Sequence, residues 1–402
     1  MSSTQRRLYE AILADHFKAH RQMALVAGPR QVGKTTLCAS FTGPERLLNW
    51  DRPEHRSVVL KGAEAVAAHF GLNHLAAKPP FVGFDELHKF GRWKAFLKGF
   101  FDGYGDRARI LVTGSSRLDV FRRGSDSLMG RYFLFRIHPL SVGELLRTEL
   151  PSQPIAPPAP IVDEAWEALW MHGGFPEPFL KRDARFSRRW QDTRRHQLLR
   201  EDVRDLTRVQ ELGQLEMLAL LLAERSGGQL IYSHLANEVR VTVDTIRRWV
   251  DTLVSLHYGF LVRPWFQNVA KSLRKEPKWF LRDWAEIPDP GARAETFAAC
   301  HLLKAVEGWN DLGLGRFELR YLRDKQQREV DFVVIRDRKP WFLVEVKNAE
   351  TSLSPTLRYY QAQLKAPHAF QVVMELPFED ADCFREKQPV VVPARTFLSQ
   401  LL

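Results

Sequence analysis

One short segment near the N-terminus constrains the fold more than any other part of the sequence. Residues 23–40 read MALVAGPRQVGKTTLCAS. The first five form an apolar run of strand length, and the last five read as the start of a helix. Between them, Gly28 to Thr35 match the pattern G-x-x-x-x-G-K-[ST]. A strand, a glycine-rich loop and a helix in this order predict an α/β domain built around a phosphate-binding loop.

The residue types of this loop favour ATP as its ligand. Glycines let backbone N–H groups curl around phosphate oxygens, and the following helix directs its positive end at the same anion. Lys34 would reach the β- and γ-phosphates, and Thr35 would supply a hydroxyl ligand to Mg²⁺. The residues predicted to bind ATP are Gly28, Pro29, Arg30, Gln31, Val32, Gly33, Lys34, Thr35 and Thr36.

A second apolar run, Phe81 to Phe84, ends in two adjacent acids about fifty residues after Lys34. We expect Asp85 to hold the Mg²⁺ through water. Glu86 would orient and deprotonate the water that attacks the γ-phosphate. This pair predicts hydrolysis as well as binding.

A third apolar run, 110–113, ends in Gly114-Ser115-Ser116. A polar side chain there could sense the γ-phosphate, with Ser115 preferred to Ser116; a plain turn is the alternative. Further on, Arg131 is the candidate arginine finger, acting on a neighbouring subunit. Three other arginines compete for that role, and each could equally be a solvated side chain: Arg117, Arg122 and Arg123.

Several ordered motifs resemble one family of prokaryotic AAA-type ATPases that carry a C-terminal nuclease-like domain. They are GPRQVGKTTL, LLNWDRPEHR, FVGFDELHKF, ILVTGSSRLDVF, SLMGRYFLFRIHPLSVGEL, HGGFPEPF and LLREDVRDL. The resemblance runs over nearly the whole chain. It implies an AAA-like core, a helical and winged-helix middle, and a C-terminal domain related to restriction-endonuclease folds. The predicted fold class is therefore multidomain α/β.

Composition divides the chain further. Five prolines within ten residues, at positions 151, 154, 157, 158 and 160, exclude a helix and indicate a linker or extended connection. We therefore predict an ATPase domain over 1–150, a proline-rich linker with a helical lid over 151–210, a winged helix-turn-helix over 211–265 and a nuclease-like domain over 266–402.

The middle contains a helix-turn-helix pattern. A short helix from Ser233, which would cap it, to Arg240 precedes a second helix capped by Thr242 and running over 243–256. Residues 259–265 would form a wing strand. The second helix would be the recognition helix, but its exposed charge is mixed. DNA contact and a purely structural role both stay open.

The C-terminal part predicts a hairpin with an acid on each strand. Asp331 lies on the first strand, and the second carries Glu345 and Lys347 on one face. This is the active-site layout of PD-(D/E)xK nucleases, in which two carboxylates hold Mg²⁺ and a lysine helps to activate water. Glu295 would be the helix acid, and a second Mg²⁺ or Mn²⁺ would bind. The alternative is a degenerate domain whose acids persist as a salt-bridge cluster with Lys347.

Charge and composition indicate partners. The 402 residues carry a net charge of +11, which favours nucleic acid over a membrane surface. No apolar run approaches the roughly 18–20 residues of a membrane span, and three scattered cysteines fit a reducing cytoplasm. We expect a Mg²⁺-dependent ATPase coupled to DNA binding or processing, with a Mg²⁺-dependent DNA endonuclease as a second activity. The alternative is an ATP-gated protein-interaction switch with an inert nuclease-like scaffold. A finger acting in trans would require a homo-oligomer.

Overall fold

The computed structural model describes residues 6–74, 76–114, 128–202, 211–265 and 276–402. The chain forms two compact units. We call residues 1–138 with 148–150 the N-terminal unit, and residues 139–147 with 151–402 the C-terminal unit. The finer division into four domains stays a prediction.

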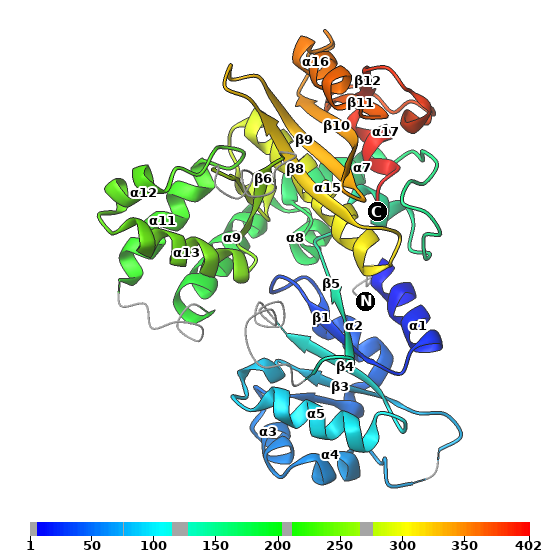
Figure 1. Cartoon of the computed structure of the whole chain (residues 1–402). Helices are drawn as coiled ribbons and strands as arrows, with labels where there is room; N and C mark the ends of the chain where they lie inside the picture. The colour runs from blue at the N-terminus through cyan, green and yellow to red at the C-terminus, as the bar shows by residue number, and fades with distance from the viewer. Residues whose placement is uncertain (1–5, 75, 115–127, 203–210, 266–275) are drawn as a thin grey trace. The chain divides into compact units, whose positions relative to one another are not determined.

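The N-terminal unit is built on five parallel strands in the order β2-β3-β4-β1-β5 (Figure 1). The strands are β1 (Met23–Ala27), β2 (Leu47–Asn49), β3 (Phe81–Asp85), β4 (Arg109–Gly114) and β5 (Tyr132–Arg136). The helices are α1 (Leu8–Ala19), α2 (Lys34–Thr42), α3 (Pro53–Leu60), α4 (Ala63–His69) and α5 (Trp93–Tyr104).

The apolar runs of this unit become central strands because parallel sheets are covered on both faces. Every residue of β1 is buried, and α5 adds Leu97 and Phe100 to the core around Val82 and Phe84. The carboxyl ends of parallel strands meet at one edge of the sheet. The loop after β1, the end of β3 and the end of β4 therefore share that edge.

The C-terminal unit combines helices with a mixed sheet of seven strands (Figure 1). The helices are α6 (Val142–Leu146), α7 (Asp163–His172), α8 (Pro176–Lys181), α9 (Ala184–Gln197), α11 (Leu212–Glu224), α12 (Tyr232–Val239), α13 (Val243–Ser255), α15 (Pro290–Asp311), α16 (Pro355–Leu364) and α17 (Ala394–Ser399). The strands are β6 (Gly259–Pro264), β7 (Lys278–Leu281), β8 (Phe317–Arg323), β9 (Glu329–Arg336), β10 (Lys339–Lys347), β11 (His368–Val373) and β12 (Val390–Pro393).

The elements from α15 to β11 follow the order α-β-β-β-α-β and include the hairpin that the sequence predicted. Asp337 and Arg338 both have positive φ, which is the geometry of a tight two-residue turn between β9 and β10. An element order identifies no activity by itself.

The strand expected as a wing, β6, joins this same sheet. It pairs antiparallel with β7 and parallel with β8. The helices that precede it are α12 and α13, and α13 buries Ile246, Trp249 and Leu253 on one face. Thr242 caps α13 as expected, because its side chain accepts a hydrogen bond from the Thr245 N–H.

The start of α12 differs from the prediction. The helix begins at Tyr232, so Ser233 lies inside its first turn and caps nothing. Ile231 has the extended conformation of an N-cap residue and offers no side-chain acceptor.

The proline-rich segment 151–160 has no helix or strand, as predicted, and it packs along the C-terminal end of the chain. The Ala156 N–H donates to the Gln400 carbonyl at 2.9 Å, and the Ala159 N–H donates to Ser399 Oγ at 3.1 Å. It is therefore an extended connection held within the C-terminal unit. Among the described residues, no helix is both long enough and apolar enough to cross a membrane.

Candidate active site

The loop after β1 has the backbone of an anion cradle. Gly33 has φ 95°, in the left-handed region that favours glycine, and it immediately precedes α2. A Cβ on Gly28 would lie 2.3 Å from the Ile137 carbonyl oxygen, so only glycine fits there. The N-terminal end of α2 can therefore present its N–H groups to phosphate oxygens.

Lys34 is the first residue of α2 and is almost fully buried. Its ammonium group donates to the carbonyls of Gly28 at 2.9 Å and Pro29 at 2.6 Å. The side chain therefore folds back over the loop that it follows. This position suits a cation meant for phosphates bound in the same loop.

Asp85, at the end of β3, is the most densely bonded acid of this site. It is 1% exposed. Thr35 Oγ1 donates to its Oδ2 at 2.9 Å, Asn49 Nδ2 donates to the same oxygen at 2.8 Å, and Thr113 Oγ1 donates to Oδ1. The structure thus brings Thr35 and Asp85 together, a hydroxyl and a carboxylate. Mg²⁺ on a nucleotide commonly takes few protein ligands beside the phosphates, so this pair fits it.

Glu86 directly follows β3 and has a left-handed backbone conformation, with φ 54°. Burial raises the pKa of its carboxyl above the usual range, and the charges of Lys34 and Lys89 oppose that rise. Its Oε2 lies 3.7 Å from both Lys89 Nζ and His88 Nε2, and is buried without a hydrogen bond among the described residues. A buried carboxylate with one oxygen that makes no hydrogen bond can accept a proton from water.

The structure does not place Arg131 near the phosphate-binding loop, Asp85 or Glu86. Arg131 precedes β5, whose first residue pairs in register with the first residue of β1. It therefore lies at the opposite edge of the sheet from the loop, where its guanidinium forms two hydrogen bonds with Asp102 at 2.7 and 3.0 Å. Ser115, Ser116, Arg117, Arg122 and Arg123 lie outside the described residues.

Three contributors were missed by the sequence analysis. Asn49 and Thr113 complete the hydrogen bonding of Asp85 from β2 and β4. Arg7 precedes α1 and donates to the carbonyl of Val32 in the loop at 2.7 Å and to that of His138 at 2.7 Å. No local pattern marks these residues, because each is recruited by a strand or loop distant in sequence.

A second group of acids lies in the C-terminal unit, gathered around one buried lysine. Lys278 Nζ, 3% exposed, lies 2.7 Å from Glu295 Oε1, 2.6 Å from Glu329 Oε1 and 3.7 Å from Asp331 Oδ1. The lysine comes from β7, at the edge of the sheet. Neither Lys278 nor Glu329 was among the predicted site residues.

The predicted hairpin acids do lie close together. Asp331 Oδ2 accepts the N–H of Val346, the residue after Glu345. Glu345 pairs with Lys347 at 3.0 Å through Oε1, and its Oε2 is buried without a hydrogen bond among the described residues. We call Lys278, Glu295, Glu329, Asp331 and Glu345 the lysine-centred cluster.

Burial controls the protonation of this cluster. Burial and, after it, the charge of Asp331 raise the pKa of Glu295 to about 8 and that of Glu345 to about 7. Burial likewise raises the pKa of Asp331. The pKa of Lys278 is also raised, because the neighbouring carboxylates outweigh its loss of hydration.

This cluster does not fit a divalent metal. The ammonium group of Lys278 already contacts three of the carboxylates, as a bound cation would. Among the described residues, no group of three or more His, Cys, Asp or Glu side chains is arranged to hold a metal ion. Carboxyls with raised pKa values also hold protons near neutral pH, which opposes metal binding.

Family comparisons agree with the site of the N-terminal unit. Residues 20–146 match a family model described as an AAA domain. The N-terminal unit therefore resembles a P-loop ATPase domain. Residues 163–285 match a domain of unknown function (DUF8612), and residues 290–397 match another (DUF4143).

Two relatives are described as uncharacterized proteins, one of Mycobacterium bovis and one of Mycobacterium tuberculosis. Each is 26% identical over 346 residues, which cover 84% of this chain and 73% of the relative. Similar solved structures include a Walker-type ATPase of Pyrococcus abyssi (14% identity, 68% and 92% of the two chains, TM-score 0.38). Another is the Aeropyrum pernix ORC1 protein in complex with DNA (13%, 74% and 94%, TM-score 0.33). Likenesses this remote carry no functional argument.

Proposed function

We propose that the N-terminal unit binds Mg²⁺-ATP and hydrolyses it through the loop after β1 and the two acids after β3. The observation that carries this proposal is the hydrogen bond of 2.9 Å between Thr35 and the buried Asp85, beside the glycine cradle. Lys34 would neutralise the β- and γ-phosphates, while Thr35 and Asp85 would hold Mg²⁺, directly and through water. The bound Mg²⁺ would neutralise developing phosphate charge.

Glu86 would accept the proton of the attacking water. Its raised pKa makes it a stronger base than an ordinary glutamate, provided the pH lies above that pKa. Ser115 would sense the γ-phosphate. Arg131 would act only on a neighbouring subunit, since the phosphate-binding loop of its own chain lies at the other edge of the sheet.

Phosphate release by the full-length chain tests this proposal. Lys34→Ala should abolish turnover, and Glu86→Gln should retain nucleotide binding while losing hydrolysis. Lys61→Ala is the matched control, since Lys61 is an exposed lysine of the same unit that follows α3. Turnover by Lys34→Ala at the wild-type rate would contradict the assignment.

We further propose that hydrolysis is coupled to DNA binding by the C-terminal unit. The paired helices α12 and α13, of which α13 is capped by Thr242, support this. DNA affinity should fall steeply between about 50 and 200 mM salt if phosphates are contacted. No binding at low salt would instead favour the ATP-gated protein-interaction switch.

The lysine-centred cluster favours binding without cleavage. A metal-dependent nuclease would need carboxylates free for the ion, whereas Lys278 contacts three of them. We therefore expect plasmid and branched DNA to stay intact with Mg²⁺ or Mn²⁺ under conditions in which the chain hydrolyses ATP. Cutting that is lost in Glu345→Gln would restore the nuclease interpretation.

A further inference from the structure

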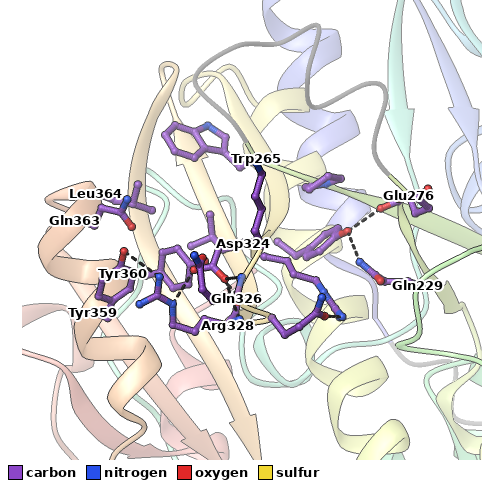
Figure 2. A pocket seen from close by; sticks show the side chains of 16 residues that line it. Gln229, Trp265, Glu276, Asp324, Gln326, Arg328, Tyr359, Tyr360, Gln363 and Leu364 are labelled. Carbon is purple, nitrogen blue, oxygen red and sulfur yellow. Dashed lines mark hydrogen bonds and ion pairs between the residues drawn. The ribbon is translucent and has the colours of Figure 1, made fainter.

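A cavity of about 890 Å³ opens on the C-terminal unit (Figure 2). Its walls come from the β8–β9 connection, from α16 and from the end of β6. Figure 2 shows Tyr359, Gln363 and Leu364 on one side and Gln229 and Glu276 on the other. This volume lies within the range of pockets that hold organic ligands.

Two aromatic rings of the cavity are accessible and held in place. Tyr359 is 40% exposed, although the Arg328 guanidinium carbon lies 3.9 Å from its ring centroid and Arg328 Nη2 donates to its hydroxyl at 3.3 Å. Trp265 is half-buried and packs against the core cluster that contains Leu322 and Val330, and its backbone N–H donates to the Tyr321 carbonyl at 2.8 Å. Rings that are exposed and already ordered lose little entropy when a flat group stacks on them.

Three cations, four amides and the two acids Asp324 and Glu276 line the cavity around these rings. Arg328 pairs with Asp324 at 2.7 Å, which fixes its guanidinium at the wall, and Lys325 is exposed at the rim. Arg323 also lines the cavity and reaches Glu329 at 2.7 Å, so this wall is continuous with the lysine-centred cluster. Four glutamines line the cavity as well: Gln229, Gln326, Gln327 and Gln363.

We propose that this cavity binds a single-stranded nucleic acid. Bases would stack on Tyr359 and Trp265, phosphates would meet Lys325 and Arg328, and the glutamine amides would contact base edges. Stacking rings within a cationic groove are how strands are bound without sequence preference. Few aliphatic side chains line the cavity, which disfavours an apolar peptide anchor. The proposal rests on DNA binding by the C-terminal unit and gives that binding a location.

The test is fluorescence anisotropy of labelled single-stranded DNA and RNA oligonucleotides of about 20 nucleotides, each titrated with the full-length chain. Tyr359→Ala should weaken binding about tenfold, the order that loss of one stacked base gives. Lys325→Ala should lower the dependence of affinity on salt by about one phosphate contact. Arg358→Ala is the matched control, since Arg358 is an exposed cation next to Tyr359 in α16 but does not line the cavity.

The outcomes separate the two proposals. Weakened binding in Tyr359→Ala and Lys325→Ala, with wild-type binding in Arg358→Ala, supports the cavity. Wild-type affinity in all three variants overturns the proposal that the cavity is the binding site and leaves the proposal of DNA binding by the chain intact. Failure of the wild-type chain to bind either oligonucleotide at low salt overturns both proposals. Tighter binding of DNA or of RNA identifies which strand the cavity takes.

Discussion

Asp85 shows how strongly a single residue of the candidate site depends on its surroundings. It is buried, and its three hydrogen bonds come from α2, β2 and β4. A buried carboxylate that loses a donor keeps the desolvation penalty without the compensating bond. The Asp85 network therefore links the stability of the N-terminal unit to the geometry of the groups proposed to hold Mg²⁺.

Thr113→Val should reveal this dependence, because valine keeps the shape of threonine and removes only the donor. We expect a loss of about 1–3 kcal/mol in the free energy of unfolding of the N-terminal unit, measured by urea denaturation. Ser40→Ala is the control: its hydroxyl donates only to the nearby Leu37 carbonyl, and its loss should cost less than about 0.5 kcal/mol. Equal stability of Thr113→Val and wild type would contradict this role of Thr113.

Lys278 offers a second prediction at this scale. Lys278→Met keeps most of the buried volume and leaves Glu295, Glu329 and Asp331 without their shared cation. Breaking a buried ion pair from one side costs about 3–5 kcal/mol, and we expect a loss of that order in urea denaturation at neutral pH. The double variant Lys278→Met/Glu295→Gln should recover part of it.

The control for that experiment is Lys387→Met, which alters an exposed lysine of the same unit. Its stability should stay close to that of wild type. If Lys278→Met were as stable as wild type, the acids of the cluster would not need the charge of Lys278, and a metal ion could take the place of its ammonium group.

At the scale of elements, the helix-turn-helix pair depends on a cap that was readable from sequence. Thr242 accepts the Thr245 N–H at 3.2 Å, so Thr242→Ala should cost about 1 kcal/mol of stability. Thr252→Ala is the matched control, because the Thr252 hydroxyl donates to the Arg248 carbonyl within α13. Hydrogen exchange of the first turn of α13 is the measurement, and unchanged exchange in Thr242→Ala would count against the cap.

Local patterns predicted elements well, and distant pairings poorly. The strand and loop of residues 23–33, the β9–β10 hairpin and the Thr242 cap each depend on neighbours in sequence, so periodicity and turn chemistry revealed them. The place of Lys278 among acids of α15 and β9 depends on β7 pairing with β6 at the sheet edge. Nothing near Lys278 in sequence reports that pairing, so the lysine at the centre of the cluster could not be predicted.

At the scale of the whole molecule, the two units should respond to different conditions. Each has its own buried core, so each can unfold as a cooperative body. The N-terminal unit contains the predicted ATP site, and the C-terminal unit contains the carboxyls whose pKa values are raised most clearly, Glu295 to about 8 and both Glu286 and Glu345 to about 7. We therefore expect ATP to change the stability of the N-terminal unit and pH to change that of the C-terminal unit.

The sign of the pH effect follows from proton binding. A buried acid with a raised pKa binds more protons in the folded state than in the unfolded state, from its ordinary pKa near 4.5 up to the raised value. The free energy of unfolding of the C-terminal unit should therefore fall as pH rises from about 5 to about 8. Lys278, whose pKa is also raised, stays charged throughout this window, and His301, whose pKa burial lowers to about 3, opposes the fall only below its ordinary pKa of 6.5.

Calorimetry of the full-length chain can test both responses in one experiment. We expect two transitions. Mg²⁺-ATP at about 100 times its dissociation constant should stabilise one of them by about 2.7 kcal/mol, because only the folded N-terminal unit binds it. Lys34→Ala should remove that shift and leave the second transition unchanged. The second transition should move to lower temperature between pH 5 and pH 8, and Glu295→Gln should reduce the movement, since the amide binds no proton. A single transition that follows both ATP and pH would mean that the units unfold together, and the two sites would then be energetically coupled through the chain.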